Sequence, residues 1–268
     1  MLGTDFKFKA RYNIDDLICI MKILRSENGC PWDKVQTHES IRTDLIEEAY
    51  EVCEGIDCGS SEMLREELGD LLMQVIFHSQ IETELGNFNF EDVCNDICQK
   101  LIYRHPHVFG EVKAETEDEV LRNWDALKKK SKDQQTYTET LESVPKTFPA
   151  LLRAEKVCRR VERAGLPINS AKDYIDKIRK GLDKLENEGL DDKDAQDRQT
   201  LLGDILLSFC NLDRILKTDG EKALTYSTNR FIIEFGSLEK AAAEKGCSLD
   251  KLPEDEVRRM AGALFGGL

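Results

Sequence analysis

The chain has 268 residues, of which 34% are charged and only 7% aromatic, and its formal net charge at pH 7 is −14. This length allows one large domain or two small ones, and a composition with only 6 prolines and many helix-forming residues favours helices over a sandwich or a barrel. A strongly acidic chain repels a phosphate backbone, which argues against nucleic-acid binding, but a divalent cation could still bridge its carboxylates to a small phosphorylated ligand.

Helical spacing of apolar residues predicts a first helix over residues 13–25, with Asn13 as a plausible N-cap. A second helix is expected over residues 37–57. A third begins after Ser60 or Ser61 and ends at Gly86. Because the third helix is apolar over much of its circumference, we expect it to lie in the middle of a bundle.

Further along, Asn89 can cap a fourth helix that Pro106 ends. Thr116 and Glu119 form a capping box for a fifth helix, which contains Trp124. The following segment, residues 131–149, is polar and shows no helical period, which predicts a linker.

The second half of the sequence repeats features of the first half in the same order, which indicates a weak internal duplication. The matched segments are residues 69–72 with 203–206, 44–46 with 176–178, and 100–101 with 230–231. The predicted fold is therefore all-α, with two tandem helical-bundle modules over residues 1–130 and 150–268.

The 9 cysteines include no C-x-x-C pair, so reduced and mostly buried thiols of a cytoplasmic protein are the simplest interpretation. The N-terminus lacks a basic region followed by an apolar run, and no signal peptide is expected. The longest apolar stretch, near residues 71–77, is too short to span a bilayer, so we expect no membrane partner.

Four carboxylates stand in two pairs with i, i+3 spacing, Glu48 with Glu51 and Glu67 with Asp70, and each pair projects from one helix face. Antiparallel packing of the two helices would bring the pairs together, and Glu47 adds another acid nearby. The alternative is that these acids are solvated, which suits the second helix but not the largely apolar third. Clustered carboxylates need a cation to stay ionised, and an all-oxygen shell suits Mg²⁺ or Mn²⁺ rather than zinc.

Basic residues near the acidic helices could balance the charge of a metal-bound phosphate chain. Lys100 and Arg104 form a pair with i, i+4 spacing, and Lys34 and Arg42 flank the second helix. The alternative is that these residues are surface cations. Trp32 could either stack on a nucleobase or anchor the turn that contains it.

Four blocks of the sequence, in this order, resemble the MazG family of nucleoside triphosphate pyrophosphohydrolases over roughly residues 12–130. The blocks are GCPWD at 29–33, EEAYE at 47–51, ELGDLL at 67–72 and RHPHVF at 104–109. Residues 151–156 look like the opening of the family's second domain. The resemblance implies an all-α and usually dimeric protein that hydrolyses a nucleoside triphosphate to the monophosphate and pyrophosphate, with Mg²⁺ held by its acidic motif.

Carried onto this chain, the resemblance implies roles for individual residues. The implied metal ligands are Glu48, Glu51, Glu67 and Asp70. The candidates for substrate binding are Lys100, Arg104, Trp32 and Lys34. A glutamate that is not fully engaged with the metal, Glu47 or Glu51, would accept the proton of the water that attacks the α–β linkage.

The second module departs from this pattern, because Lys180 takes the place of Glu48 and Leu201 that of Glu67. It should not assemble the same metal site, and we expect a structural, dimerising or regulatory role for residues 150–268.

We therefore predict a cytoplasmic homodimeric hydrolase whose cofactor is Mg²⁺, for which Mn²⁺ could substitute. A di-iron carboxylate bundle is excluded because the chain has no Glu-x-x-His pair. The remaining alternative is a non-enzymatic nucleotide-binding or regulatory helical scaffold. The degenerate second module favours it, and the intact first module argues against it.

Overall fold

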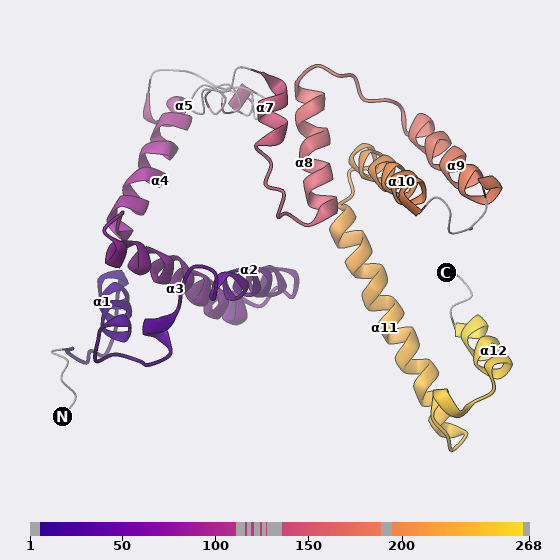
Figure 1. The fold of residues 1–268 in the computed structure, drawn as a ribbon, viewed down its shortest axis with the longest axis horizontal. Coiled ribbons are helices and arrows are strands. Elements are labelled where there is room, and N and C mark those ends of the chain that lie inside the picture. Colours follow the sequence, from indigo (N-terminus) through magenta and orange to yellow (C-terminus); the bar gives the residue numbers. More distant parts are fainter. Residues whose placement is uncertain are drawn as a thin grey trace. The chain divides into compact units, whose positions relative to one another are not determined.

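The computed structural model describes residues 6–110, 136–188 and 195–264, together with the isolated positions 116, 119, 120, 124 and 127. Within these residues every regular element is a helix (Figure 1), so the prediction of an all-α fold is confirmed. The chain divides into two compact units, Met1–Lys128 and Lys129–Leu268. No helix of the described residues is both long enough and apolar enough to cross a membrane.

The first unit is built around a hairpin of two long helices. Its elements are α1 (Ile14–Arg25), η1 (Asp33–Val35), α2 (Arg42–Asp57), α3 (Ser61–Leu85), α4 (Phe90–Arg104) and α5 (Pro106–Phe109). A short turn folds α2 back onto α3, and α3 also contacts α1 and α4. The third helix is thus central, as its apolar circumference predicted.

Local sequence explains where three of these helices begin and end. Asn13 and Asn89 each accept a hydrogen bond from the backbone N–H three residues later and start α1 and α4. Ser60 caps α3 in the same way. Gly86 ends α3 with a φ of 76°, a left-handed conformation that glycine adopts without steric cost.

The second helix begins at Arg42, later than predicted. Residues 37–40 form a turn instead, in which the backbone N–H of Thr37 donates to Ser40 Oγ and that of Ser40 donates to Thr37 Oγ1. Such side-chain bonds offer the backbone an alternative to helix formation. Ile41 follows this turn directly and packs into the hydrophobic core, where it is 1% exposed.

That core joins α1, Ile41 and α3, and its buried members are Met21, Ile41, Ile76, Phe77 and Ile81. The guanidinium of Arg25 lies over the ring of Phe77, 5.1 Å from the ring centroid. The same guanidinium donates to the carboxylate of Glu84 and to the carbonyls of Asp33 and Gln36. Arg25 therefore ties the loop after α1 to both α1 and α3.

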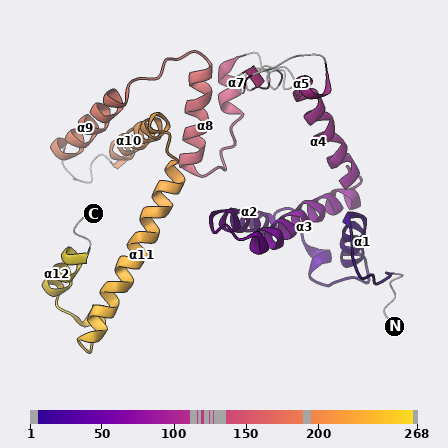
Figure 2. The same ribbon diagram turned by 180° about the vertical axis from the view of Figure 1, so that it is seen from behind.

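The second unit contains a comparable hairpin. Its elements are α7 (Tyr137–Glu142), α8 (Ala150–Arg163), α9 (Ala171–Glu188), α10 (Ala195–Leu216), α11 (Gly220–Glu244), η3 (Leu249–Lys251) and α12 (Glu254–Leu264). Helices α9 and α10 lie side by side in both views (Figure 1 and Figure 2), and α8 contacts α10 as α1 contacts α3. A Cβ added to Gly181 would lie 2.6 Å from Ile205 Cγ1, so this close crossing of α9 and α10 depends on glycine.

Part of the segment predicted as a linker is folded. It contains α7, which Thr136 caps, and Val144 is only 1% exposed. Arg160 of α8 donates to the carbonyl of Thr140 and so holds α7 against α8. The sequence did not reveal α7 because six residues are too few to show a helical period. Residues 131–135 lie outside the described residues.

All nine cysteines are unpaired, but the expectation that most are buried was wrong. Five are exposed and only Cys210 is buried. The exposed thiols lie on α1, on α2 and the turn after it, and on α4.

Candidate metal centre

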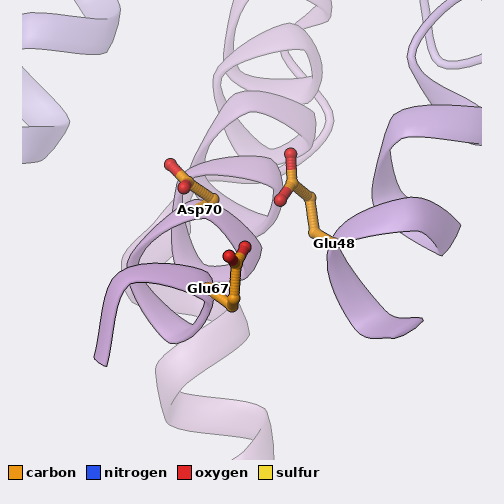
Figure 3. Close-up of side chains that lie close together, drawn as sticks. All are labelled: Glu48, Glu67 and Asp70. Atoms are coloured by element: carbon orange, nitrogen blue, oxygen red, sulfur yellow. The ribbon is translucent and has the colours of Figure 1, made fainter. Parts of the chain in front are cut away.

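The structure brings three of the four predicted metal ligands together between α2 and α3. One carboxylate oxygen from each of Glu48, Glu67 and Asp70 lies within 4.8 Å of the others. Figure 3 shows Glu48 reaching from α2 toward the two side chains of α3. The cluster arises because i, i+3 spacing places Glu67 and Asp70 on one face of α3, and the hairpin turns that face toward α2.

The fourth predicted ligand, Glu51, lies beside this carboxylate cluster. Its charge contributes to raising the pKa of both Glu48 and Glu67. Glu47 does not belong to the cluster and is exposed, because the next residue of an α-helix lies about 100° further round the axis. Of the two candidate proton acceptors, only Glu51 therefore lies next to the clustered oxygens.

Burial and mutual repulsion both act on the clustered acids. Desolvation, followed by the charges of Asp70 and Glu51, raises the pKa of Glu48 above its usual value. Desolvation also raises the pKa of Glu67, together with the charges of Glu51 and Glu66. A cation between the carboxylates would relieve this repulsion.

The donor set fits a hard divalent cation. Every ligand atom of the cluster is a carboxylate oxygen, and no histidine or cysteine of the described residues joins it. Oxygen donors suit Mg²⁺ and Mn²⁺, whereas zinc sites usually include nitrogen or sulfur.

The predicted cationic pair lies toward the end of α4. The guanidinium of Arg104 lies over the ring of Trp124, 5.3 Å from its centroid, and its Nε is buried without a hydrogen-bond partner. The ring of His105 meets the same indole edge-on at 5.0 Å. Lys100 is exposed one turn earlier. In the described part of the chain, neither Lys100 nor Arg104 forms an ion pair with the carboxylate cluster.

Trp124 was not among the residues selected from the sequence. It lies in the expected fifth helix, most of which falls outside the described residues, although the N–H of Glu119 does donate to Thr116 Oγ1 as the capping box predicted. The sequence feature that could have identified Trp124 is a tryptophan in the element that follows a pair of basic residues, since arginine commonly stacks on tryptophan.

The remaining predicted residues lie in the loop after α1. Trp32 is 57% exposed, which argues against a role as a core anchor. Lys34 donates to the carbonyl of Glu27 at 3.1 Å. Arg42 is exposed at the start of α2. Among the described residues, none of these three side chains forms an ion pair with the carboxylate cluster.

The second unit has no such cluster among its described residues. Lys180 and Asp183 are exposed on α9, and Asp204 is exposed on α10. The two remaining acids are thus not gathered with a third one.

The model of the MazG nucleotide pyrophosphohydrolase domain matches residues 36–109, the region that holds α2, α3, α4 and the carboxylate cluster. The chain is 37% identical over 243 residues to the nucleoside triphosphate pyrophosphohydrolase/pyrophosphatase MazG of Thermotoga maritima, covering 91% of this chain and 92% of that protein. It is 38% identical over 238 residues to the nucleoside triphosphate pyrophosphohydrolase of Escherichia coli K12, covering 88% and 90%. It is also 36% identical to the uncharacterized protein YabN of Bacillus subtilis, of which it covers 49%.

Proposed function

Because the chain belongs to the MazG family of nucleotide pyrophosphohydrolases, we propose that it hydrolyses nucleoside triphosphates with Mg²⁺ held at the carboxylate cluster. The reaction cleaves the α–β linkage and yields a nucleoside monophosphate and pyrophosphate, so the chain is a hydrolase acting on acid anhydrides. The supporting observation is the group of three acids within 4.8 Å, which lies inside the region that matches the family.

In this proposal Glu48, Glu67 and Asp70 hold the cation and Glu51 completes the carboxylate set. The cation, Mg²⁺ or Mn²⁺, would offset the negative charge of the triphosphate when bound. Glu51 accepts the proton of the attacking water, since it adjoins the cluster and its charge acts on both Glu48 and Glu67. Glu47 is the less suitable base because it is exposed about 100° round α2 from Glu48, whereas the charge of Glu51 acts on both Glu48 and Glu67.

On the substrate side, Lys100 and Arg104 bind the phosphates. The cation–π contact with Trp124 supports this role for Arg104, because it holds the guanidinium at the end of α4 while its Nε remains without a partner. Trp32 is the exposed aromatic residue that could stack on the base, and Lys34 stands beside it.

We also propose that the protein is a homodimer in which the α2–α3 hairpin meets its counterpart. The hairpin has an exposed apolar stripe of Ile46, Tyr50, Leu68, Leu72 and Val75. These residues recur at spacings of three and four on each helix, so on each helix they share one face, and a contiguous apolar surface of this kind usually marks an interface.

The roles of the two halves are part of the same proposal. Residues 1–130 form the catalytic domain, residues 131–149 connect it to the second domain, and residues 150–268 form a degenerate domain with a structural, dimerising or regulatory role. The substitutions Lys180 and Leu201 at two ligand positions support this division. A cytoplasmic location is supported by nine unpaired cysteines.

The direct test is to incubate the protein with a panel of nucleoside triphosphates and identify the products by ³¹P NMR. Monophosphate and pyrophosphate, formed only when Mg²⁺ or Mn²⁺ is present, are expected. Diphosphate and orthophosphate as products would contradict cleavage at the α–β linkage. Nucleotide binding without turnover would favour the regulatory scaffold instead.

A further inference from the structure

A chain of hydrogen bonds joins the segment before α2 to the second half of α3. His38 lies four residues before α2, and its Nε2 is 2.7 Å from Glu82 Oε1. Its Nδ1 is 2.7 Å from Nδ1 of His78, and the two rings are nearly parallel, 9° apart. The second oxygen of Glu82 accepts from Asn87 Nδ2 at 2.7 Å.

The neighbours of each ring determine which nitrogen carries hydrogen. Hydrogen bonds from Asn87 and His38 lower the pKa of Glu82, so this carboxylate is ionised and His38 Nε2 donates to it. In a neutral imidazole the other nitrogen then accepts, so the donor between the rings is His78 Nδ1. Burial lowers the pKa of His78 and favours its neutral form.

The same face of α3 carries the metal ligand Asp70. Asp70, Gln74, His78 and Glu82 follow one another at intervals of four residues and form one polar line along the helix. Gln74 is 4% exposed, and its Oε1, like Nε2 of His78, is buried without a partner. The side of α3 that meets His38 is therefore continuous with the side that meets Glu48.

The hydrogen-bonded histidines lie at one end of the α2–α3 hairpin, and the connecting turn lies at the other. At the turn, Gly55 allows α2 to approach α3 so closely that a Cβ would lie 3.0 Å from the backbone N of Leu64. The carboxylate cluster lies between these two ends. Without a cation, the charge of Glu48 repels those of Glu67 and Asp70 and tends to separate the helices.

We propose that His38 and His78 are positioning residues for the metal centre, holding the start of α2 against α3 so that Glu48 stays opposite Glu67 and Asp70. The proposal rests on the proposed function only in taking the carboxylate cluster as a metal site. Ligands that are already in place need little rearrangement on binding, so a cation should bind more tightly when this contact is intact. From the usual strength of one hydrogen bond, we expect its loss to weaken binding about three- to tenfold.

The test measures Mn²⁺ binding to the full-length protein without nucleotide, by the EPR signal of the free ion. His78→Leu removes the bond to His38, whereas His78→Asn retains a nitrogen donor near the position of Nδ1. Gln80→Leu is the matched control, because it removes a hydrogen bond to Glu84 within the same helix and leaves both partners of His38 in place. We expect H78L to bind Mn²⁺ about three- to tenfold more weakly, H78N to recover most of the affinity and Q80L to match the wild type.

Unchanged affinity in H78L, or equal weakness in H78N and H78L, would overturn the proposal. Hydrogen–deuterium exchange of residues 42–46 in the metal-free protein gives a second readout, which should be faster in H78L than in Q80L. If the wild type takes up no Mn²⁺, the metal centre of the proposed function is wrong, and only the exchange measurement then tests the positioning role. Equal exchange rates of residues 42–46 in H78L and Q80L would overturn that role. Should H78L unfold, His38→Gln replaces it, since glutamine can still donate to Glu82 while lacking the imidazole Nδ1 that accepts from His78.

Discussion

Arg25 and Glu84 form an ion pair with two parallel hydrogen bonds, from Nε to Oε1 at 2.9 Å and from Nη2 to Oε2 at 2.8 Å. The Arg25 side chain is only 5% exposed and also holds two loop carbonyls, so its removal leaves several buried groups without partners. We expect Arg25→Ala to lower the free energy of unfolding by about 2–3 kcal/mol. Urea unfolding followed by tryptophan fluorescence reports this, because both tryptophans belong to the first unit.

The control for this substitution is Arg65→Ala, which removes an exposed arginine from α3. An exposed helical position should change stability by less than about 0.5 kcal/mol. Equal effects of R25A and R65A would mean that the Arg25–Glu84 pair does not hold the loop.

Asp70 and Asp204 occupy matching Gly-Asp positions in the two halves and offer a paired test of where catalysis occurs. Asp70→Asn removes a cluster carboxylate and should lower pyrophosphate release at least about hundredfold, since a metal ligand contributes several kcal/mol to the transition state. Asp204→Asn should leave the rate unchanged, because Asp204 is exposed and outside any three-acid group of the described residues. A comparable loss in D204N would place chemistry in the second unit.

Glu51 and Glu47 can be separated by the same assay. Glu51→Gln should lower kcat about hundredfold, as expected when a general base is lost. Glu47→Gln should change kcat by less than about threefold, because Glu47 is exposed and faces away from the carboxylate cluster. The assignment of Glu51 fails if E47Q shows the larger loss.

The raised pKa values of Glu48 and Glu67 predict a stability that depends on pH in the metal-free protein. The pKa of each group is higher in the folded chain than its usual value of 4.5, so the folded chain binds these protons more tightly than the unfolded chain does. The stability that the two groups contribute is therefore present below about pH 4.5 and is lost as the pH rises through the raised pKa values. Glu48→Gln removes this repulsion. We expect its melting temperature in EDTA to exceed that of the wild type at about pH 8, with a difference that shrinks on acidification.

Addition of Mg²⁺ should reverse this order, because the cation stabilises the wild type and binds the variant more weakly. If E48Q melts below the wild type in EDTA at every pH, the carboxylates do not repel one another in the way proposed.

The exposed apolar stripe of the hairpin predicts the outcome of a charge substitution. Leu68 is 49% exposed, and Leu68→Glu should convert a homodimer to a monomer, because a charge at the centre of an apolar interface loses its hydration. Phe8→Ser is the control, since Phe8 is 84% exposed and lies outside the hairpin. Sedimentation velocity distinguishes the species, and an L68E protein that remains dimeric would place the interface elsewhere.

The sequence predicted those features that depend on short-range rules. Asn13, Ser60 and Gly86 marked helix ends because caps act within one turn. The i, i+3 acids were found because their spacing alone decides which helix face they share. The turn before α2 was missed, since the exchange of hydrogen bonds between Thr37 and Ser40 competes with a helix that propensity alone would continue.

Short-range rules could not predict contacts between residues that are distant in the sequence. His38 and His78 are 40 residues apart, and only the folded hairpin brings their nitrogens together. The stacking of Arg104 on Trp124 likewise depends on how two elements cross. Exposure of the cysteines was also unpredictable, because an apolar helix face looks the same whether its own chain or another molecule covers it.

All three clustered carboxylates come from residues 48–70, within a single pair of adjacent helices. A duplicated gene can therefore lose the chemistry through a few point mutations while retaining the architecture. In the second unit α9 and α10 cross closely at Gly181, and Lys180 and Leu201 stand where the predicted alignment of the two halves places Glu48 and Glu67. The acids that a metal centre needs and the glycine that lets two helices approach are thus separate residues of one hairpin, so either can change while the other is kept.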